Sequence, residues 1–508
     1  MNGKGKEQTS SNRNGFALFF LFALFSLIST FSAEATTYYI SPSGSDSAAG
    51  SATAPWATFG KAWGVLNPGD TLIVKDGTYN QNAAPPAGKS GAAGNVIPVQ
   101  AQNDGLAHIT QPVSFRNNSY VAFIGVKITG SDNAVEVGSN GTGLMSHHLS
   151  FQRIGFNCTV TNNDNACFSL GDGTHHILLE DSWGWGGGRY TVLAYGGPGG
   201  NPPNTTCDYN TFRRLVLREG PNISSGGNPQ AGLSLYYASN NIVENVIVLD
   251  SVPASDSSNS AFYLTGHAPP PNTSNNKFYG VLALNNLGLG WYLGHNGTGS
   301  NNELRNSVIW DSAEGGVVLY AAGTCAANLV DHVISGAHTG SGLENYCDAT
   351  SVKSSIFVNN SQYGMRQGSS QGTIATSNWN DFYNNASGAR LNVSAGANDK
   401  TANPALLYLV RMETGSACVG GGESGTDCGA DLTKRYQDGT ITTTPLWPWP
   451  NEDRIQKEMC TDAGVTRGFC AAQTLTKYIW EYLGSPCPSD ICSASVLQPG
   501  PPQNLRIR

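Results

Sequence analysis

The residues of this chain that could do chemistry are concentrated between positions 180 and 219. Two adjacent carboxylates open the stretch, a turn rich in tryptophan and glycine follows, and arginines recur about one repeat apart. A basic group with a lowered pKa, beside a cation that neutralises a carboxylate, can remove the proton next to that carboxylate, as in β-elimination from a uronic acid. The candidate catalytic residues are Arg189, Arg214 and Arg218, and the candidate ligands of a Ca²⁺ cofactor are Glu180, Asp181 and Glu219.

The same charged residues have a purely structural interpretation. Arginine and carboxylate side chains on neighbouring repeats also form ion pairs, which occupy both partners. The two interpretations differ in where they place the groups. Catalysis requires Arg189, Arg214, Arg218 and a carboxylate to converge in one groove, whereas ion pairing disperses them or pairs them off.

A short repeated pattern organises the chain around this stretch. Between residues 241 and 385, apolar runs of five or six residues each end in Asn or Asp. The closing position recurs every 23 to 35 residues, at Thr129, Asn157, Trp185, Glu219, Asp250, Asn285, Asp311, Gly336, Asn359 and Asn384. Repeats of this length bury their apolar faces by stacking, and such short runs of Val, Ile, Leu and Phe form strands. The pattern predicts an all-β fold, a parallel β-helix, with the closing side chains stacked in a ladder at one corner.

A second strand follows each of these runs and alternates apolar with aromatic residues. Strand alternation turns one set of side chains inward, namely Leu233, Leu235, Phe262, Leu264, Trp291, Leu293, Val317 and Leu319. The outward set includes Tyr236, Tyr263, Tyr292, Tyr320 and Tyr346. We predict that these tyrosines and Trp183 bind substrate by stacking on pyranose rings. Ordinary aromatic packing along the sheet is the alternative.

Two histidine pairs, His147-His148 and His175-His176, open consecutive repeats. They occupy the slot that asparagine pairs fill in later repeats, such as 240–241 and 275–276. Histidines stacked at a corner are a candidate metal site, and the alternative is that they are turn residues in a repeated slot.

Residues 1–35 have the pattern of a secretory signal peptide. Three basic residues precede an apolar run from Phe16 to about Phe31, and small residues follow at 33–35. We therefore expect a secreted protein, extracellular or at the cell surface, that is not held in a membrane after cleavage. The formal net charge is −8, and removing a leader with three basic and two acidic residues makes it about −9. This charge argues against a nucleic-acid partner.

Residues 38–79 resemble a known family. They contain, in order, Gly44, Asp46, Gly50, Trp56 and the turn Asn67-Pro-Gly-Asp70, which an apolar strand follows. This order is similar to the opening of secreted right-handed parallel β-helix proteins of the pectate-lyase-like superfamily, particularly those akin to chondroitinase B and alginate lyases. The resemblance implies an N-terminal cap with a helix from about Phe59 to Val65, opened by Thr58 as N-cap. It implies the fold and carries over no catalytic residue.

Eleven cysteines in an exported chain indicate disulfide bonds. Their spacing favours local pairs, namely Cys158–Cys167, Cys325–Cys347, Cys418–Cys428, Cys460–Cys470 and Cys487–Cys492, with Cys207 left over. We predict a signal peptide (1–35), a parallel β-helix (36–400) that includes the N-terminal cap (36–110), a disulfide-rich cap with short helices at the C-terminal end of the solenoid (401–493), and a flexible tail (494–508).

Two functions fit these features. The first is a secreted protein that binds an acidic extracellular polysaccharide and cleaves it by β-elimination, as a polysaccharide lyase does. The second is a non-catalytic surface, matrix or adhesin protein that uses the solenoid as a rigid scaffold.

Overall fold

The computed structural model describes residues 1, 3, 35–139, 143–160, 164–171, 173–197, 205–218, 230–251, 259–266, 272–294, 299–320, 324–368, 372–471 and 473–492. Most of the predicted signal peptide and all of the predicted tail lie outside these residues. The chain divides into two compact units, Met1–Thr36 and Thr37–Arg508, and the second contains all the elements below. No helix among the described residues is long and apolar enough to cross a membrane.

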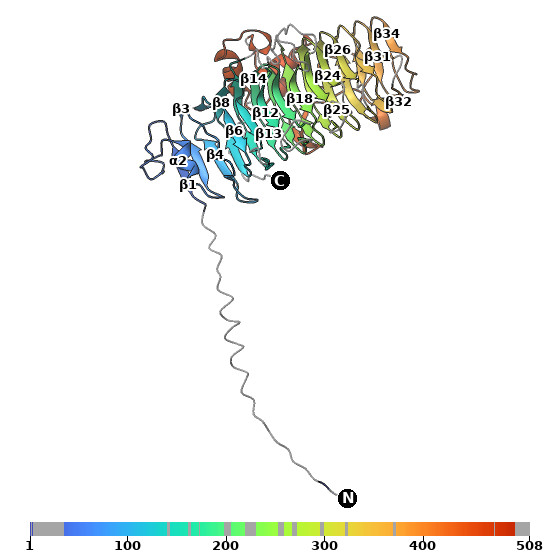
Figure 1. Ribbon diagram of the computed structural model, residues 1–508. Helices are drawn as coiled ribbons and strands as arrows, with labels where there is room; N and C mark the ends of the chain where they lie inside the picture. Colours follow the sequence, from blue (N-terminus) through green and yellow to red (C-terminus); the bar gives the residue numbers. More distant parts are fainter. Residues whose placement is uncertain are drawn as a thin grey trace. The chain divides into compact units, whose positions relative to one another are not determined.

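The second unit is a parallel β-helix, as the repeats predict (Figure 1). Each coil contributes three strands, for example β13 (Leu178–Glu180), β14 (Trp183–Gly186) and β15 (Tyr190–Tyr195), and each pairs in parallel with its counterpart one coil further on. We call the three sets the first layer, the second layer and the third sheet. β25 (Glu303–Ser312) and β27 (Leu329–Gly336) run through the corner between the two layers and join them into one 23-stranded sheet. The third sheet has 11 strands.

The remaining strands extend these three sets. The first layer also contains β1 (Thr37–Ile40), β2 (Thr71–Val74), β4 (Ile97–Ala101), β7 (Val121–Ile124), β10 (Ser150–Gln152), β16 (Thr211–Arg213), β19 (Ile242–Glu244), β22 (Lys277–Tyr279), β29 (Thr350–Lys353) and β32 (Ile374–Asn378). The second layer also contains β3 (Gly77–Tyr79), β5 (Ala107–Ile109), β8 (Lys127–Gly130), β11 (Gly155–Cys158), β17 (Val216–Arg218), β20 (Ile247–Leu249), β23 (Leu282–Asn286), β30 (Ile356–Val358) and β33 (Asp381–Tyr383). The third sheet also contains β6 (Val113–Arg116), β9 (Val135–Gly138), β12 (Ala166–Gly171), β18 (Gln230–Tyr236), β21 (Asn259–Thr265), β24 (Leu289–Gly294), β26 (Gly315–Leu319), β28 (Leu343–Asn345), β31 (Tyr363–Gln367) and β34 (Gly388–Leu391).

The interior of the solenoid is filled by apolar side chains and by polar ladders at its corners, of which a short one joins His338, Asn360 and Asn385 and a longer one consists of asparagines. All eight side chains predicted to face inward from the third sheet are buried in the main core. At the corner that leads into the first layer, each asparagine side chain accepts a hydrogen bond from a backbone N–H one coil before it, which belongs to Ile177 for the first asparagine and to the preceding asparagine for the other four. This longer ladder consists of Asn210, Asn241, Asn276, Asn302 and Asn328. It satisfies backbone groups that would otherwise be buried without a partner.

The predicted ladder of closing residues at the end of the second layer is correct in parts. Asn285 Nδ2 donates to Asp250 Oδ1 at 2.8 Å, and Asn384 Nδ2 donates to Asn359 Oδ1 at 2.7 Å. Strand register places four predicted members, Thr129, Asn157, Trp185 and Gly336, one residue before the position of Asp250 and Asn285. For the last two, the structure shows which residue takes the corner. Gly186 and Ala337, one residue later, have the left-handed corner conformation in their place.

The N-terminal cap matches the resemblance of residues 38–79. α2 (Phe59–Trp63) lies beside β1, and the Thr58 hydroxyl accepts a hydrogen bond from the Lys61 N–H at 3.1 Å, which makes Thr58 the N-cap as predicted. Asp46 holds the start of this helix by accepting from the N–H groups of Ala57 and Thr58. The cap covers the first coil, whose edge would otherwise expose unpaired backbone groups.

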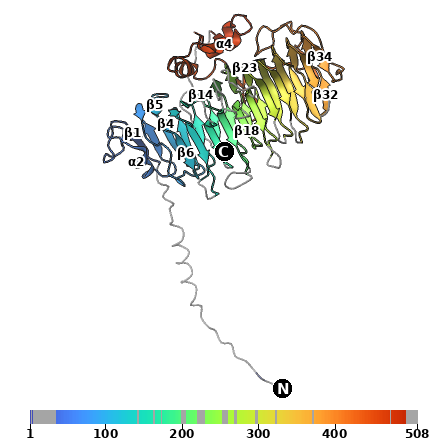
Figure 2. The same cartoon turned by 45° about the horizontal axis from the view of Figure 1, so that its top comes forward.

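A disulfide-rich C-terminal cap is present, but it lies along the outer face of the second layer and not only at the end of the solenoid (Figure 2). Its elements are η1 (Glu423–Gly425), β35 (Lys434–Gln437), β36 (Thr440–Pro445), α3 (Glu452–Gln456), η2 (Lys457–Thr461), η3 (Gly468–Cys470), α4 (Leu475–Trp480) and α5 (Ser489–Cys492). Most outward side chains of the second layer from β20 onward are apolar, and they form a second core with those of the cap. This core includes Ile247, Leu249, Leu282, Leu284, Val308, Trp310, Trp449, Met459 and Trp480. The burial of this apolar face explains why the cap runs back along the coils.

All five predicted disulfide bonds form. They join Cys158 to Cys167, Cys325 to Cys347, Cys418 to Cys428, Cys460 to Cys470 and Cys487 to Cys492. Cys207, the cysteine left over by the spacing argument, is buried and free.

Candidate functional site

The arginine and carboxylate cluster is a set of ion pairs at the corner between the first and second layers. Arg214 donates from Nε to Asp181 Oδ1 and from Nη2 to Glu180 Oε1, both at 2.6 Å. Burial alone would lower the pKa of Arg214, but the adjacent Asp181 and Glu180 outweigh burial and raise it. A general base requires a lowered pKa, so this environment opposes the role predicted for Arg214.

Arg213 shares the Glu180 Oε1 atom with Arg214 and extends the cluster to further carboxylates. It donates to Glu180 Oε1 at 3.2 Å and to Glu244 Oε2 at 2.7 Å, and it also pairs with Asp438 of the C-terminal cap. Because Glu180 and Asp181 are held by arginines, they do not fit the predicted Ca²⁺ site, and we assign no cation to them. Glu219, the third predicted ligand, lies outside the described residues.

Arg218 and Trp183 are enclosed by the C-terminal cap. The Arg218 side chain is 0% exposed, donates from Nη2 to the Arg467 carbonyl at 3.0 Å, and stacks over the Phe469 ring at 5.3 Å. Trp183 is also 0% exposed and donates from Nε1 to Glu458 Oε2 at 3.0 Å. The predicted roles require contact with a polysaccharide, whereas the C-terminal cap covers both side chains in this arrangement.

Arg189 lies on a different side of the coil from Arg214 and Arg218. It precedes β15 of the third sheet, is half-buried, and lies 3.9 Å from Asp164. Arg214 occupies the corner after β16, and Arg218 ends β17 of the second layer. The structure therefore does not bring the three predicted catalytic arginines together.

The predicted tyrosines form two outward columns on the third sheet. In one column Ser234, Tyr263, Tyr292, Val318 and Glu344 pair from coil to coil. The other column contains Tyr236, then Thr265 and Gly294 in the tyrosine slot, then Tyr320 and Tyr346. Tyr263 is 2% exposed, whereas Tyr320 is 40% exposed. The predicted tyrosines therefore differ in exposure, and the more accessible ones lie on the C-terminal coils.

Three of the five tyrosines line one groove on the outer face of β24, β26 and β28. The groove encloses about 300 Å³. Tyr292, Val318 and Glu344 form its floor as one register column, and Tyr320 and Tyr346 form one wall, with ring centroids 5.1 Å apart.

The opposite wall consists of residues that precede the strands. Glu314 precedes β26, Gly340 lies one coil later, and Gln362 precedes β31. The backbone fixes their spacing, because the N–H of Gln362 donates to the Gly340 carbonyl at 3.2 Å. Oxygen and amide groups on this wall thus face aromatic rings on the other.

A polar network anchors the floor of the groove. Arg366, which follows Glu344 in register, pairs with Glu344 Oε2 at 2.9 Å and donates to the Tyr346 hydroxyl at 2.9 Å. Burial would lower the pKa of Arg366, but Glu344 and Tyr346 raise it, so the guanidinium stays charged. The network fixes the orientation of the Tyr346 ring at the groove wall.

Strand alternation predicts the tyrosines on one side of this groove, but it does not predict the polar residues on the other side. Glu344 could have been predicted as well, because strand alternation puts it on the same face as Tyr346. Glu314 and Gln362 precede their strands in corners of variable length, and no periodicity places such residues.

The sequence and the backbone were each compared with those of known proteins. No family model and no curated protein matches the sequence. Similar solved structures include pectate lyase Pel9A, with 16% identity and a TM-score of 0.44 over 78% of this chain and 95% of that one. The strand pairing shows that the protein is a parallel β-helix.

Two further solved structures have a similar course. The A-module of the mannuronan C-5 epimerase AlgE4 from Azotobacter vinelandii has 13% identity and a TM-score of 0.44, over 66% of this chain and 91% of that one. A mannuronic acid specific polysaccharide family 6 lyase from the human gut microbiota has 15% identity and a TM-score of 0.39, over 70% and 82%. At these values the likeness carries no conclusion about activity or substrate.

Proposed function

We propose that the protein binds a polysaccharide in the groove formed by β24, β26 and β28. The observation that carries the proposal is the convergence of Tyr292, Tyr320 and Tyr346 with Glu314 and Gln362 around one open groove. Concave sites with aromatic walls and a few fixed polar groups are typical of small-molecule and carbohydrate ligands.

The two walls complement the two kinds of surface on a sugar. A tyrosine ring offers an apolar face to the C–H face of a pyranose and keeps a hydroxyl for hydrogen bonding. Carboxylate and amide oxygens opposite accept hydrogen bonds from sugar hydroxyls. Neighbouring strands are about 4.8 Å apart, so the three coils that hold Tyr292, Tyr320 and Tyr346 span about 10 Å along the solenoid. We therefore place the polymer along the solenoid axis.

The charge of the groove influences whether it binds a neutral or an acidic polysaccharide. Sequence analysis expected an acidic polysaccharide. Glu314 and Glu344 line the groove, and the neighbouring Arg366 is already paired with Glu344. Arg366 is engaged by Glu344, and Glu314 adds a negative charge, so the described residues of the groove offer no cation dedicated to a uronate, and we propose that neutral polysaccharides bind more tightly than acidic ones.

We assign binding and no reaction to this groove. The described residues that line it include no arginine, lysine or histidine that could act as the base in β-elimination. Arg214 and Arg218 are held in ion pairs elsewhere. Polysaccharide binding is part of the first of the two functions that the sequence suggested, and we do not assign its cleavage step to this groove.

We further propose that the mature protein is secreted and works outside the cell or at its surface. Two observations support this location: the pattern of residues 1–35 and five disulfide bonds in one chain. Disulfide bonds of this number persist in oxidising compartments.

The proposal is tested by affinity electrophoresis of the mature protein through gels that contain neutral or uronic-acid polysaccharides. We expect retardation by at least one neutral polymer, and loss of that retardation in Tyr320→Ala. Tyr39→Ala, in the N-terminal cap, is the matched control. Ultraviolet absorbance of the unsaturated product, with and without Ca²⁺, tests β-elimination in parallel. Retardation only by polyuronates would overturn the proposed preference, and no retardation by any polymer would overturn the proposed function.

A further inference from the structure

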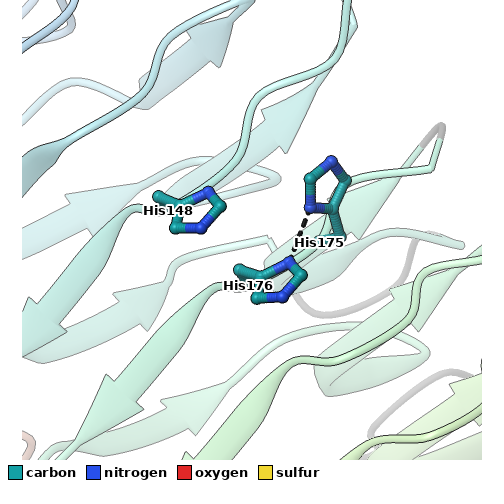
Figure 3. A group of neighbouring side chains, drawn as sticks. All are labelled: His148, His175 and His176. Carbon is teal, nitrogen blue, oxygen red and sulfur yellow. Dashed lines mark hydrogen bonds between the residues drawn. The ribbon is translucent and has the colours of Figure 1, made fainter. Parts of the chain in front are cut away.

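Four histidines from two consecutive coils meet at one corner of the solenoid, away from the groove. His147-His148 precede β10 and His175-His176 precede β13, and the backbones of His147 and His175 pair in parallel. Figure 3 shows three of these side chains, His148, His175 and His176, with their rings close together. All four are partly exposed.

The four rings form an array of two rows and two columns. Along the solenoid, His147 stacks on His175 with centroids 5.2 Å apart, and His148 stacks on His176 at 4.7 Å. Across the corner, the Nδ1 atoms of His147 and His148 are 2.8 Å apart, as are those of His175 and His176. The Nδ1 nitrogens of both pairs therefore point towards one another.

These separations are close to those between two nitrogens bound to one metal ion. Imidazole nitrogens bind Zn²⁺ at about 2.0–2.1 Å, which puts two of them about 2.9 Å apart at a right angle and about 3.3 Å apart in a tetrahedron. Nitrogens of His148, His175 and His176 all lie within 4.8 Å of one another. A bound ion would require these rings to rotate until their nitrogens lie about 3.3 Å apart.

The donor set selects the kind of ion. Imidazole suits Zn²⁺, Cu²⁺ and Ni²⁺, whereas Ca²⁺ and Mg²⁺ require oxygen ligands. We propose that His148, His175 and His176 bind one divalent transition metal ion, such as Zn²⁺, with His147 placed to complete a set of four nitrogens. The ion would join two successive coils at their corner.

The protonation of the cluster is compatible with this assignment. Burial and the neighbouring His176, His147 and His175 together lower the pKa of His148 to about 4. Burial and nearby histidines also lower the pKa of His147 and of His175. Neutral imidazoles have a free lone pair, so an ion entering at neutral pH displaces few protons.

The competing interpretation is a stack of rings without a metal. Tyr120, His148, His176 and Tyr209 stack in one column, with centroids 4.9, 4.7 and 5.6 Å apart. Tyrosine takes the corner slot on either side of the two histidine coils, so stacking alone would not require histidine. The change to paired histidines on two adjacent coils favours a ligand.

The experiment is Zn²⁺ titration of the mature chain, prepared without a polyhistidine tag, by isothermal calorimetry and by metal analysis after dialysis. We expect one Zn²⁺ per chain and a higher unfolding temperature with Zn²⁺ than with a chelator. His148→Asn/His176→Asn removes two ligands and keeps the corner, because Asn240 and Asn275 have the same left-handed conformation as these histidines. In this variant we expect at least a tenfold loss of Zn²⁺ affinity.

His332→Asn is the matched control. His332 occupies another corner in the left-handed conformation, and Asn306 fills the same position one coil earlier. We expect the His332→Asn variant to bind Zn²⁺ with the same affinity as the wild type. The absence of saturable binding near one ion per chain would show an aromatic stack only, and equal affinity in the wild type and in His148→Asn/His176→Asn would place the ion elsewhere. Either result overturns the proposal.

Discussion

Arg218 and Asp250 face each other beneath the C-terminal cap, with Arg218 Nε 3.6 Å from Asp250 Oδ2 and neither side chain exposed. Asp250 also accepts hydrogen bonds from the Phe469 N–H at 3.2 Å and from the Tyr478 hydroxyl at 3.1 Å. The pair thus lies where two coils meet the cap. Its role is to join the cap to the solenoid.

Removing one partner of this pair should therefore destabilise the fold. In Arg218→Met the side chain still fills space under Phe469, but Asp250 is left buried without its cation. We expect a loss of about 3–5 kcal/mol in the free energy of unfolding, measured by urea denaturation. Lys477→Met is the control, because its pair with Glu481 is exposed and should change stability by less than about 0.5 kcal/mol. Equal stability of Arg218→Met and wild type would show that the pair does not secure the cap.

The outer face of the second layer should behave as a core. Leu284 points away from the solenoid interior, yet it is fully buried against the cap. Leu284→Ala should cost about 2–5 kcal/mol of unfolding free energy. Leu193 also points outward, from the third sheet, and is only half-buried, so Leu193→Ala should cost about 1 kcal/mol or less. Similar losses in both variants would contradict the asymmetry between these two faces.

The position of the cap was the main point that the repeats did not predict. Alternation correctly placed the inward residues of the third sheet, because apolar residues take every second position along its strands. In the second layer, runs such as Ile247-Val-Leu249 and Leu282-Ala-Leu284 are apolar at every position. Continuous runs of this kind are typical of strands buried on both faces. The sequence therefore predicts that the outer face of the second layer is covered. It does not predict which segment covers this face.

The candidate site shows the same division. Tyr292, Tyr320 and Tyr346 follow from strand alternation, whereas Glu314 and Gln362 lie in corners whose length varies. The sequence could not show whether the arginines are paired. A cluster of opposite charges on adjacent coils has the same composition whether its arginines are free to bind substrate or already form ion pairs. Contact distances, such as the 2.6 Å between Arg214 Nε and Asp181 Oδ1, distinguish the two cases.

The buried asparagine ladder should contribute more to stability than the exposed asparagines beside it. Asn276 Oδ1 accepts from the Asn241 N–H at 3.0 Å, and its Nδ2 donates to the Ala238 carbonyl at 2.9 Å. Asn276→Ala leaves both backbone groups buried without partners, so we expect a loss of about 3 kcal/mol.

Asn275→Ala is the matched control for the ladder. Asn275 has a left-handed conformation at φ 59°, and Ala327 and Ala349 occupy the same slot in later coils. Its substitution should cost only about 1 kcal/mol. Thermal unfolding of both variants measures the difference, and a larger loss in Asn275→Ala would contradict the assignment of the ladder.

His338 should make stability depend on pH. It is fully buried, with Nδ1 accepting from the Ser312 N–H and Nε2 beside the Ser335 hydroxyl, and burial lowers its pKa to about 3. The unfolded chain binds this proton below about pH 6.5, whereas the folded chain does not, so stability falls as the pH drops from about 6.5 towards 3. Between pH 7 and pH 5 the expected loss from this group is about 2 kcal/mol.

His338→Asn isolates this effect. Asn360 and Asn385 hold the same ladder position in the next coils, so asparagine fits the slot. The difference in unfolding free energy between wild type and His338→Asn should shrink by about 2 kcal/mol from pH 7 to pH 5. A difference that stays constant over this range would show that the folded protein binds the proton at His338.

The central claim is that Tyr320 and Tyr346 hold a sugar chain in the groove. The most direct measurement is isothermal calorimetry with an oligosaccharide of the polymer that retards the protein, on wild type, Tyr320→Ala/Tyr346→Ala and Tyr39→Ala. The account predicts at least a tenfold weaker Kd in the double variant, about 1.4 kcal/mol, and an unchanged Kd in Tyr39→Ala. An unchanged Kd in a folded Tyr320→Ala/Tyr346→Ala protein would contradict it.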